Sequence, residues 1–338
     1  MKILVTGGAG YIGSHTVLAL IEHGYDPIIL DDFSNADERI IAELEGIAGR
    51  SLTVYKVDCK DQNTLQQVFE EEPNIQGVIH FAAFKAVGES VEQPLKYFEN
   101  NVGSLIALLQ ICKEYRVQNI VFSSSCTVYG EPDTMPVTES TPIKPAISPY
   151  GETKQICERI LLQSYLSMAG RVSLLRYFNP IGAHASGRIG ELPHGVPNNL
   201  VPHIQQTAAG IRNELTVHGN DYDTHDGTCI RDYIDVNDLA NAHCLALQWM
   251  AEQNEPVIDV VNLGVGQGRS VLEVIETFSA VNEVSVPYMI GPRRNGDVVS
   301  IWADNTKARH QFGWKPQFSL ADSLKHAWKW QQYVEANW

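Results

Sequence analysis

Short, almost continuous apolar runs alternate in the first half of the chain with longer segments whose apolar residues recur at helical spacing. The runs expected to be strands are Lys2–Val5, Ile28–Leu30, Val54–Val57, Gly77–Phe81, Asn119–Ser123 and Val172–Tyr177. The segments expected to be helices are Ile12–Glu22, Leu65–Glu71, Leu95–Tyr115 and Tyr150–Leu166. Apolar strands that alternate with helices are typical of a parallel sheet covered on both faces. The pattern therefore predicts an α/β fold with a Rossmann-like, doubly wound parallel sheet.

The character of the sequence changes near residue 179. Residues 179–199 are rich in Gly, Pro, His and Asn and have little periodicity. The elements expected after them are a strand at Ile230–Val236 and helices at Asp238–Ala251 and Val271–Val281. We therefore expect two domains, which agrees with a domain size of roughly 150 residues. We expect residues 1–178 to form the first and residues 179–338 to form a smaller C-terminal α/β domain, with some elements of the second returning to the first.

The composition narrows the class of protein. Apolar residues make up 44% of the chain and charged residues 19%, which allows a sizeable core and excludes a disordered chain. Lys and Arg number 25 against 40 for Asp and Glu, and the net charge of −15 disfavours binding to nucleic acid or to an anionic membrane. No apolar run approaches the roughly 20 residues that span a bilayer. We expect a cytoplasmic enzyme with neither of these partners.

The cysteines and histidines do not have the spacing that is typical of disulfides or metal sites. The six cysteines show no CxxC spacing, which indicates reduced and mostly buried thiols in a chain of this size. The eleven histidines contain no HExxH motif or other clustered ligand spacing. We therefore expect no metal.

Three glycines mark a dinucleotide-binding turn. Gly7, Gly10 and Gly13 have GxxGxxG spacing and lie between the first expected strand and the first expected helix. Glycine allows the tight turn and the close approach of a diphosphate to the helix N-terminus. Asp31 ends the second expected strand, where a carboxylate binds ribose hydroxyls and repels a 2′-phosphate. The pattern predicts NAD rather than NADP, and the strand and helix around it disfavour an ordinary glycine-rich turn.

A YxxxK motif provides the second candidate site. Tyr150 and Lys154 stand four residues apart on an expected helix and therefore share one face. An adjacent ammonium, together with a cationic nicotinamide, favours the ionised form of a phenol. Ser125 ends a serine run at the carboxyl edge of the expected sheet, from which it can bond both Tyr150 and a substrate hydroxyl. The alternative for YxxxK, a solvated helical face, is disfavoured by the Rossmann pattern before it.

Segments along nearly the whole chain resemble the UDP-glucose 4-epimerase family, in the extended, nucleotide-sugar branch of the short-chain dehydrogenase/reductase superfamily. They are TGGAGYIGSHT, HFAAFKAVGES, SSSCTVYG, SPYGETK, LLRYFNPIGAH, GVPNNL and GTCIRDYI. The resemblance runs in register from Thr6 to at least Trp314. It implies that the first domain binds NAD, that the second binds a UDP-sugar, and that the protein is a homodimer.

The resemblance also implies roles for individual residues. Tyr150 matches the family's catalytic base, with Lys154 and Ser125 as its catalytic partners. The residues that match cofactor contacts are Gly7, Gly10, Tyr11, Ile12, Gly13, Asp31, Asn35, Asp58, Cys59, Phe81, Ala82, Ala83, Lys85, Asn100, Tyr150, Lys154 and Phe178. Those that match substrate contacts are Lys85, Ser125, Tyr150, Asn179, Asn199, Leu200, Val217, His218, Arg231, Tyr233, Arg294, Asp297 and Ile301.

The implied reaction is the NAD-dependent 4-epimerisation of a UDP-hexose, UDP-glucose or UDP-galactose, through a transient 4-keto sugar. Two positions depart from the family pattern: Ile301 replaces a pocket-wall aromatic found in some members, and His218 stands where an aromatic often faces uracil. One alternative is the same reaction on UDP-N-acetylglucosamine. A second is a nucleotide-sugar dehydratase, which carries an acid pair where this chain has Cys126 and Thr127. A third, a non-catalytic NAD-sensing regulator, has no need of the Tyr–Lys pair.

Overall fold

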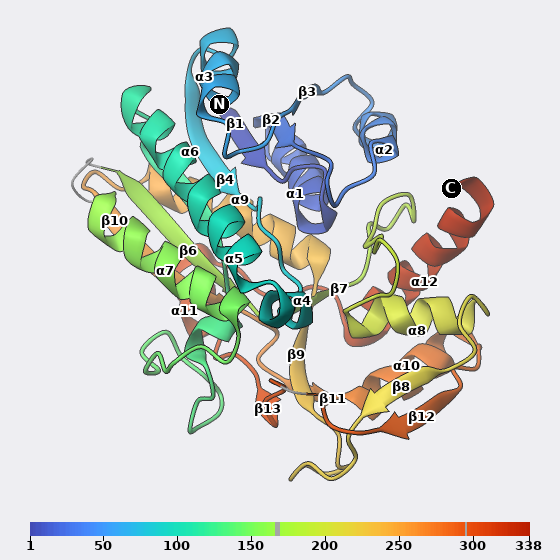
Figure 1. Ribbon diagram of the computed structural model, residues 1–338. Coiled ribbons are helices and arrows are strands. Elements are labelled where there is room, and N and C mark those ends of the chain that lie inside the picture. Colours follow the sequence, from blue (N-terminus) through green and yellow to red (C-terminus); the bar gives the residue numbers. More distant parts are fainter. Residues whose placement is uncertain (166–169, 295) are drawn as a thin grey trace.

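The computed structural model describes residues 1–165, 170–294 and 296–338, and its largest element is a seven-stranded sheet (Figure 1). The strand order is β10-β6-β5-β4-β1-β2-β3, and every adjacent pair is parallel. The strands are β1 (Lys2–Thr6), β2 (Asp26–Asp31), β3 (Thr53–Lys56), β4 (Ile75–His80), β5 (Asn119–Ser125), β6 (Arg171–Tyr177) and β10 (Val257–Leu263). The doubly wound parallel sheet expected from the apolar runs is confirmed.

Helices cover both faces of this sheet, which is why its strands are rich in apolar residues on both sides. On β1, Ile3 and Val5 pack into one core cluster and Leu4 into another, because successive side chains point to opposite faces. The first cluster is covered by α1 (Tyr11–Glu22), α2 (Arg39–Ala48), α9 (Val236–Ala251) and α11 (Thr306–Phe312). The second is covered by α3 (Gln62–Glu71), α6 (Gly103–Glu114) and α7 (Pro149–Ser164).

The helix expected over Leu95–Tyr115 is divided into three pieces. A short helix α5 (Pro94–Tyr97) leads into a π-helical turn, η1 (Phe98–Val102), and then into α6. The Asn101 side chain in the turn bonds the backbone of Phe84 and the Thr153 hydroxyl, so it ties the preceding loop to α7. π-Helical turns are frequent at functional sites. At the end of α7, the predicted helix residue Leu166 lies outside the described residues.

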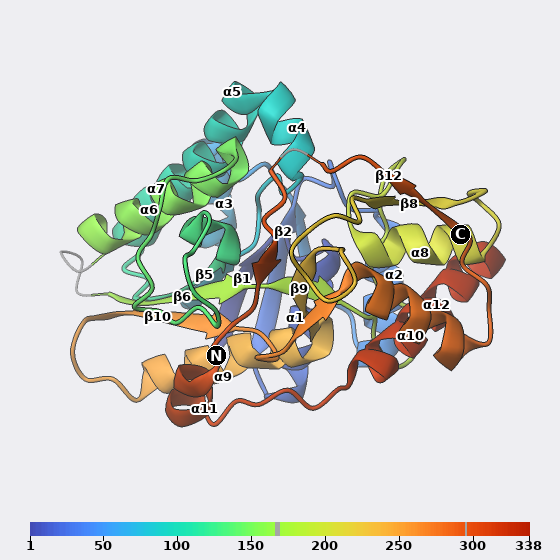
Figure 2. The same cartoon turned by 90° about the horizontal axis from the view of Figure 1, so that it is seen from below.

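A smaller group of elements lies to one side of the main sheet (Figure 2). Its central strand is β9 (Ile230–Asp235), which pairs with β7 (Asn179–Ile181), β11 (Gly268–Ser270) and β13 (Ser300–Ile301). Strands β8 (Leu215–His218) and β12 (Tyr288–Gly291) form a separate parallel pair. The helices of this group are α8 (Leu200–Ala208), α10 (Val271–Asn282) and α12 (Leu320–Asn337). Their apolar faces meet in a third core cluster that includes Val274, Phe278 and Leu324.

The chain returns to the first sheet after entering the smaller group. Strand β10 pairs in parallel with β6, and α9 packs against α1. Residues 236–263 and α11 therefore lie with the N-terminal elements, whereas the other strands of the C-terminal half and helices α8, α10 and α12 form the smaller group. The division of the chain after residue 178 stays a prediction.

One carboxylate of the smaller group forms hydrogen bonds with the backbone that follows β10. Asp232 on β9 is fully buried and accepts hydrogen bonds from the backbone N–H groups of Val265 at 2.7 Å, Gly266 at 3.0 Å and Ala303 at 3.1 Å. Burial raises its pKa to about 6, although these three bonds oppose the shift. A single side chain therefore satisfies three backbone donors from two segments.

Replacing Asp232 with Asn should lower the free energy of unfolding by about 1–3 kcal/mol, because an amide nitrogen would face a buried donor and leave it unpaired. Urea unfolding of the variant and the unmodified protein measures the change. Asp133→Asn is the matched control, since Asp133 is exposed and pairs with Lys144 at the surface. Equal effects of the two substitutions would contradict the role of Asp232.

Candidate active site

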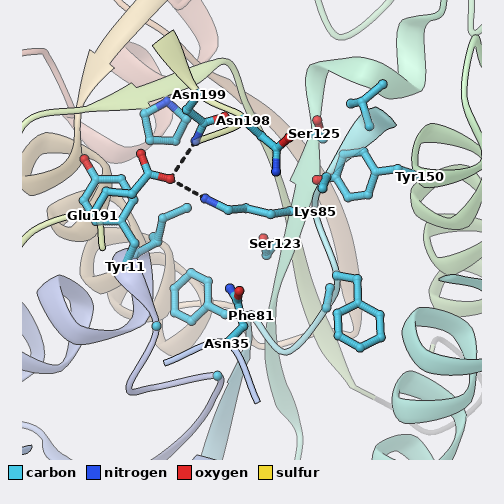
Figure 3. A pocket seen from close by; sticks show the side chains of 18 of the residues that line it. Tyr11, Asn35, Phe81, Lys85, Ser123, Ser125, Tyr150, Glu191, Asn198 and Asn199 are labelled. Carbon is cyan, nitrogen blue, oxygen red and sulfur yellow. Dashed lines mark hydrogen bonds and ion pairs between the residues drawn. The ribbon is translucent and has the colours of Figure 1, made fainter. Parts of the chain in front are cut away.

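One cavity of about 590 Å³ at the carboxyl edge of the main sheet brings most of the predicted site residues together (Figure 3). From the cofactor set it is lined by Gly7, Gly10, Tyr11, Ile12, Gly13, Asp31, Asn35, Asp58, Cys59, Phe81, Ala82, Ala83, Lys85, Asn100, Tyr150, Lys154 and Phe178. From the substrate set it is also lined by Ser125, Asn179, Asn199, Arg231, Arg294, Asp297 and Ile301.

Four predicted substrate residues lie away from the lining of this cavity. Val217 and Tyr233 are buried in the third core cluster, and Leu200 packs against the same cluster. His218 is exposed at the end of β8, where its Nδ1 lies 3.3 Å from the carbonyl oxygen of Pro292. Their roles in substrate binding stay predictions.

The turn between β1 and α1 and the start of α1 have no room for a side chain at Gly7 or Gly13. Gly7 has a φ of +69°, and a Cβ added there would lie 2.8 Å from the backbone nitrogen of Ala82. A Cβ on Gly13 would lie 2.1 Å from the carbonyl oxygen of Gly7. Gly10, the N-cap residue of α1, has no side chain to cap the helix, so N–H groups at the helix start are open to a ligand. This geometry suits a diphosphate.

Asp31 lies beside this turn at the end of β2. Its carboxylate is buried and accepts hydrogen bonds from the backbone N–H groups of Ala9 at 3.0 Å and Phe33 at 2.9 Å. Burial raises its pKa, and the backbone hydrogen bonds oppose the shift. Because Asp31 also lines the cavity, its free lone pairs can accept hydrogen bonds from a ribose.

Helix α7 carries Tyr150 and Lys154 into the cavity. The helix begins at Pro149, and the Ser148 hydroxyl caps it by accepting a hydrogen bond from the backbone of Gly151 at 3.2 Å. Lys154 is buried, and its Nζ donates to the carbonyl oxygen of Ser123 at 2.6 Å. The same Nζ lies 5.8 Å from the centre of the Tyr150 ring. The expected placement of both side chains on one helical face is confirmed.

Burial moves both of these side chains toward their neutral forms. It raises the pKa of Tyr150 to about 12, although a hydrogen bond with Ser125 opposes the shift. It lowers the pKa of Lys154 to about 8. The expectation that an adjacent ammonium and a cationic nicotinamide together favour the phenolate stays a prediction, since burial is the largest influence on the pKa of Tyr150 in the protein alone.

A carboxylate that sequence reasoning missed links two predicted residues. Glu191 accepts hydrogen bonds from the Lys85 ammonium at 2.6 Å and from the Asn199 amide at 2.7 Å (Figure 3). It lies in the segment of little periodicity and outside every motif, so only its position between two matching segments could have pointed to it. Other cavity residues that were missed include Phe84, Ser123, Ile147, Tyr177, Pro180 and Asn198.

Two arginines lie in the wall of the cavity contributed by the smaller group. Asp297 accepts from Arg294 at 2.9 and 3.2 Å, and its Oδ1 lies 3.5 Å from Arg231. Guanidinium groups held in this way suit a diphosphate, with which each can form paired hydrogen bonds. Ile301 is buried in the same wall and packs in a core cluster with Cys126, Tyr129 and Phe178.

The part of the chain that the structure describes holds no group of three His, Cys, Asp or Glu side chains placed to bind a metal ion. Within the same residues, no helix combines the length and the apolar character needed to cross a bilayer. All six cysteines are buried and free.

Comparison with known proteins agrees with this geometry. A family model described as GDP-mannose 4,6 dehydratase matches residues 4–327. A UDP-glucose 4-epimerase of Bacillus subtilis (strain 168) is 47% identical over 332 residues, which cover 98% of this chain and 97% of that protein. The chain belongs to the UDP-glucose 4-epimerase family. The resemblance inferred from the motifs is confirmed.

Two crystal structures of this family have nearly the same fold. The UDP-glucose-4-epimerase of Stenotrophomonas maltophila, with bound NAD and formylated UDP-arabinopyranose, has a TM-score of 0.96 and 44% identity, covering 99% of each chain. The UDP-glucose 4-epimerase of Bifidobacterium longum, in complex with NAD⁺ and UDP, has a TM-score of 0.96 and 42% identity, covering 100% of each chain.

The name of the family model does not make this chain a dehydratase. The residues directly after the serine strand are Cys126 and Thr127, neither of which carries a carboxyl group. Cys126 is buried, and burial raises the pKa of its thiol to about 12. This position therefore has no acid or base for the elimination of water.

Replacing Gly13 with Ala should destabilise the protein by more than the roughly 1–3 kcal/mol of ordinary overpacking, because the added methyl group meets fixed backbone. Thermal unfolding, followed by circular dichroism, measures the loss. Gly103→Ala is the control, since a Cβ there meets only the Lys60 side chain at 4.0 Å. A Gly13→Ala variant as stable as this control would contradict the tight turn.

Proposed function

We propose that this protein catalyses the NAD-dependent 4-epimerisation of a UDP-hexose, with UDP-glucose and UDP-galactose as the preferred pair. Membership of the epimerase family supports the reaction. The observation that carries the proposal is the meeting of three features in one cavity: the glycine turn, the Tyr150–Lys154 pair and the Arg231–Arg294 pair. The reaction needs these three parts to bind the cofactor, move a proton and hold the nucleotide.

The residues of the β1–α1 turn fit NAD. Gly7 and Gly13 leave backbone without side chains beside the open helix start, and the Asp31 carboxylate would repel a 2′-phosphate. NAD, when bound, supplies an acceptor for the C4 hydride of the sugar and returns that hydride to the opposite face. Because the cofactor is regenerated in each cycle, we expect the protein to retain it through purification.

Tyr150 serves as the base that takes the proton of the C4 hydroxyl, with Ser125 bonded between them. Burial alone holds the pKa of Tyr150 near 12, so the base becomes effective when the positive charge of a nicotinamide ring lies beside it. Lys154, fixed on the carbonyl oxygen of Ser123, adds its own charge. Arg231 and Arg294 hold the diphosphate while the 4-keto sugar turns about it, after which Tyr150 returns its proton.

The direct test is incubation of the purified protein with UDP-galactose and separation of the products by chromatography. Formation of UDP-glucose without added NAD⁺ is the expected result. A 4-keto-6-deoxy product would instead identify a dehydratase, and recovery of unchanged UDP-galactose would refute the proposed activity. Denaturing a sample and assaying the supernatant for nicotinamide tests the retention of the cofactor.

We further propose a homodimer and a cytoplasmic location. Apolar side chains are exposed on three helices: Leu95 on α5 is 80% exposed, and Ile106 on α6 and Leu162 on α7 are also exposed. Figure 1 shows these three helices next to one another on the same side of the main sheet. A second copy of this chain is the partner that would cover them, because adjacent exposed apolar side chains are typical of protein interfaces. The six free cysteines support a reducing compartment.

Replacing Tyr150 with Phe should lower kcat by about 10²–10⁴-fold, the usual contribution of a general base. KM for the UDP-sugar should change little, because the arginines are intact. Lys154→Met should also be slow, and its rate should rise toward high pH, where the phenol ionises without the ammonium. Tyr288→Phe, at an exposed strand position, is the control. Near-normal turnover in Tyr150→Phe would show that another group is the base.

Ile301 should set the choice of sugar. Its branched side chain is stiff and buried, so housing an acetyl group against it costs about 1–3 kcal/mol. We expect kcat/KM for the N-acetylated pair to be roughly 5- to 150-fold lower than for UDP-galactose. Ile301→Tyr should abolish the weaker activity and Ile301→Ala should raise it. Equal or greater kcat/KM for UDP-N-acetylglucosamine in the unmodified enzyme would overturn this preference.

The exposed face of α5–α7 should set the oligomeric state. Light scattering after size exclusion should give twice the 37.5 kDa of one chain. Leu95→Glu should shift the protein to a monomer, because burial of an unpaired carboxylate opposes association. Ile211→Glu, at an exposed apolar residue elsewhere, should remain a dimer. A dimer that survives Leu95→Glu would place the interface on another face.

A further inference from the structure

A buried row of polar side chains crosses three adjacent strands behind the Tyr150–Lys154 pair. Ser124 of β5 is paired in register with Arg176 of β6, which is paired with Asn262 of β10. These residues are 1%, 3% and 0% exposed. A buried guanidinium is costly unless it is paired, so the row needs a counter-charge.

That counter-charge comes from α7. The Glu158 carboxylate forms two bonds with Arg176, at 2.9 Å from Nε and 2.7 Å from Nη2, and also accepts a hydrogen bond from the Ser124 hydroxyl at 2.5 Å. Glu158 stands one helical turn after Lys154 and is as deeply buried as Arg176. One carboxylate therefore joins β5, β6 and α7, the elements that carry Ser125, Tyr177 and the Tyr–Lys pair.

The remaining side chains of the row are also held in place. The Tyr129 ring lies 4.8 Å from the Arg176 guanidinium, and its hydroxyl donates to Asn262 at 2.6 Å. Asn262 donates in turn to the carbonyl oxygen of Val137 at 3.1 Å. A buried ion pair is an inefficient source of stability, since apolar residues of similar volume often replace one without loss. Its position against the catalytic helix therefore points to a role in the reaction.

We propose that Glu158 is a positioning residue for the epimerase reaction: its carboxylate holds α7 in register with β5 and provides the negative charge that favours the ammonium form of Lys154 beside Tyr150. The proposal rests on the proposed roles of Tyr150 and Lys154. Burial lowers the pKa of Lys154 to about 8, and Glu158 is among the groups that oppose this shift. Arg176 keeps the pair neutral overall.

The other groups near Tyr150 and Lys154 leave Glu158 as the main negative charge. The titratable groups on the surrounding elements are Cys157 on α7, Cys126 after β5, His80 on β4, Tyr177 and Arg176 on β6, Tyr97 on α5, and Glu89 on α4. Burial lowers the pKa of His80 to about 3 and raises the pKa of Cys126 and Cys157 to about 12, so these three are neutral. Glu89 is paired with Lys96 at 2.6 Å.

The net charge that a substitution leaves on the Glu158–Arg176 pair determines the direction in which the pH profile of kcat should shift. Glu158→Gln leaves the Arg176 charge unpaired, because arginine is not deprotonated in proteins. This excess positive charge should lower the pKa of Lys154 and of Tyr150, and shift the pH profile of kcat toward lower pH by about one unit. Arg176→Met leaves a negative charge and should shift the profile toward higher pH. Glu158→Gln/Arg176→Met is neutral and should return the profile to its original position.

The experiment measures kcat from pH 5 to 10 for the unmodified enzyme, both single variants and the double variant. Loss of the bonds that Glu158 forms with Arg176 and Ser124 should lower kcat about 10- to 100-fold in all three variants, because small displacements of reacting groups slow the reaction. Glu152→Gln on the same helix is the control: Glu152 pairs with Arg159 at 3.3 Å at the surface, and both kcat and the profile should be unchanged.

Two results would overturn the proposal. The first is an unshifted profile in folded Glu158→Gln, which would reduce the pair to a structural contact. The second is an unchanged kcat in the neutral double variant. This result would overturn the proposal even if the single variants do not fold. A spectroscopic measurement separates this proposal from the epimerase function. The tyrosinate absorbance is recorded against pH for the unmodified protein and for Tyr150→Phe. The difference between the two curves gives the titration of Tyr150 and needs no turnover. That titration should shift in Glu158→Gln even in a protein that lacks epimerase activity.

Discussion

In a parallel sheet the carboxyl ends of all strands lie along the same edge, and the chemistry of this protein depends on that constraint. Strands β1, β2, β4 and β5 are largely apolar until their last residues, which are Thr6, Asp31, His80 and the serines of β5. Polar groups far apart in the sequence therefore meet at one edge without entering the core. The hydrogen bond from Lys154 to the carbonyl oxygen of Ser123 then joins the catalytic helix to that edge.

The electrostatics of the site follow from its burial. Desolvation raises the pKa of Tyr150 to about 12, which keeps the phenol neutral in the protein alone, and lowers the pKa of Lys154 to about 8, which weakens the preference for the ammonium without removing it at neutral pH. Positive charge brought by the oxidised cofactor would favour the phenolate that accepts the proton, and loss of that charge on reduction would favour the neutral phenol that holds the proton until the hydride returns to the sugar. Proton transfer by Tyr150 would in this way be coupled to the direction of hydride transfer.

The sequence predicted the parts of the molecule that have local signals. The apolar runs predicted six strands of the main sheet, and the GxxGxxG and YxxxK spacings predicted the glycine turn and the inward face of α7. Strand β10 was missed because Asp259 and Asn262 interrupt its apolar run; the structure pairs Asp259 with Lys307 and buries Asn262 in the polar row. The hydrogen-bonded Glu158–Arg176 pair depends on sheet topology, which no local pattern encodes.

The glycine turn, Asp31 and the Tyr150–Lys154 pair with Ser125 were predicted from spacing and position, whereas the other ligand contacts were predicted by resemblance to a family; the structure gathers most of them in one cavity. The central claim is that the C4 hydride leaves the sugar and returns to it within one active site. The most direct measurement uses UDP-glucose with deuterium at C4, incubated with the purified protein in ordinary water, and mass spectrometry of the UDP-galactose formed. The account predicts that the product retains the deuterium, whereas replacement of the label by solvent hydrogen would contradict it.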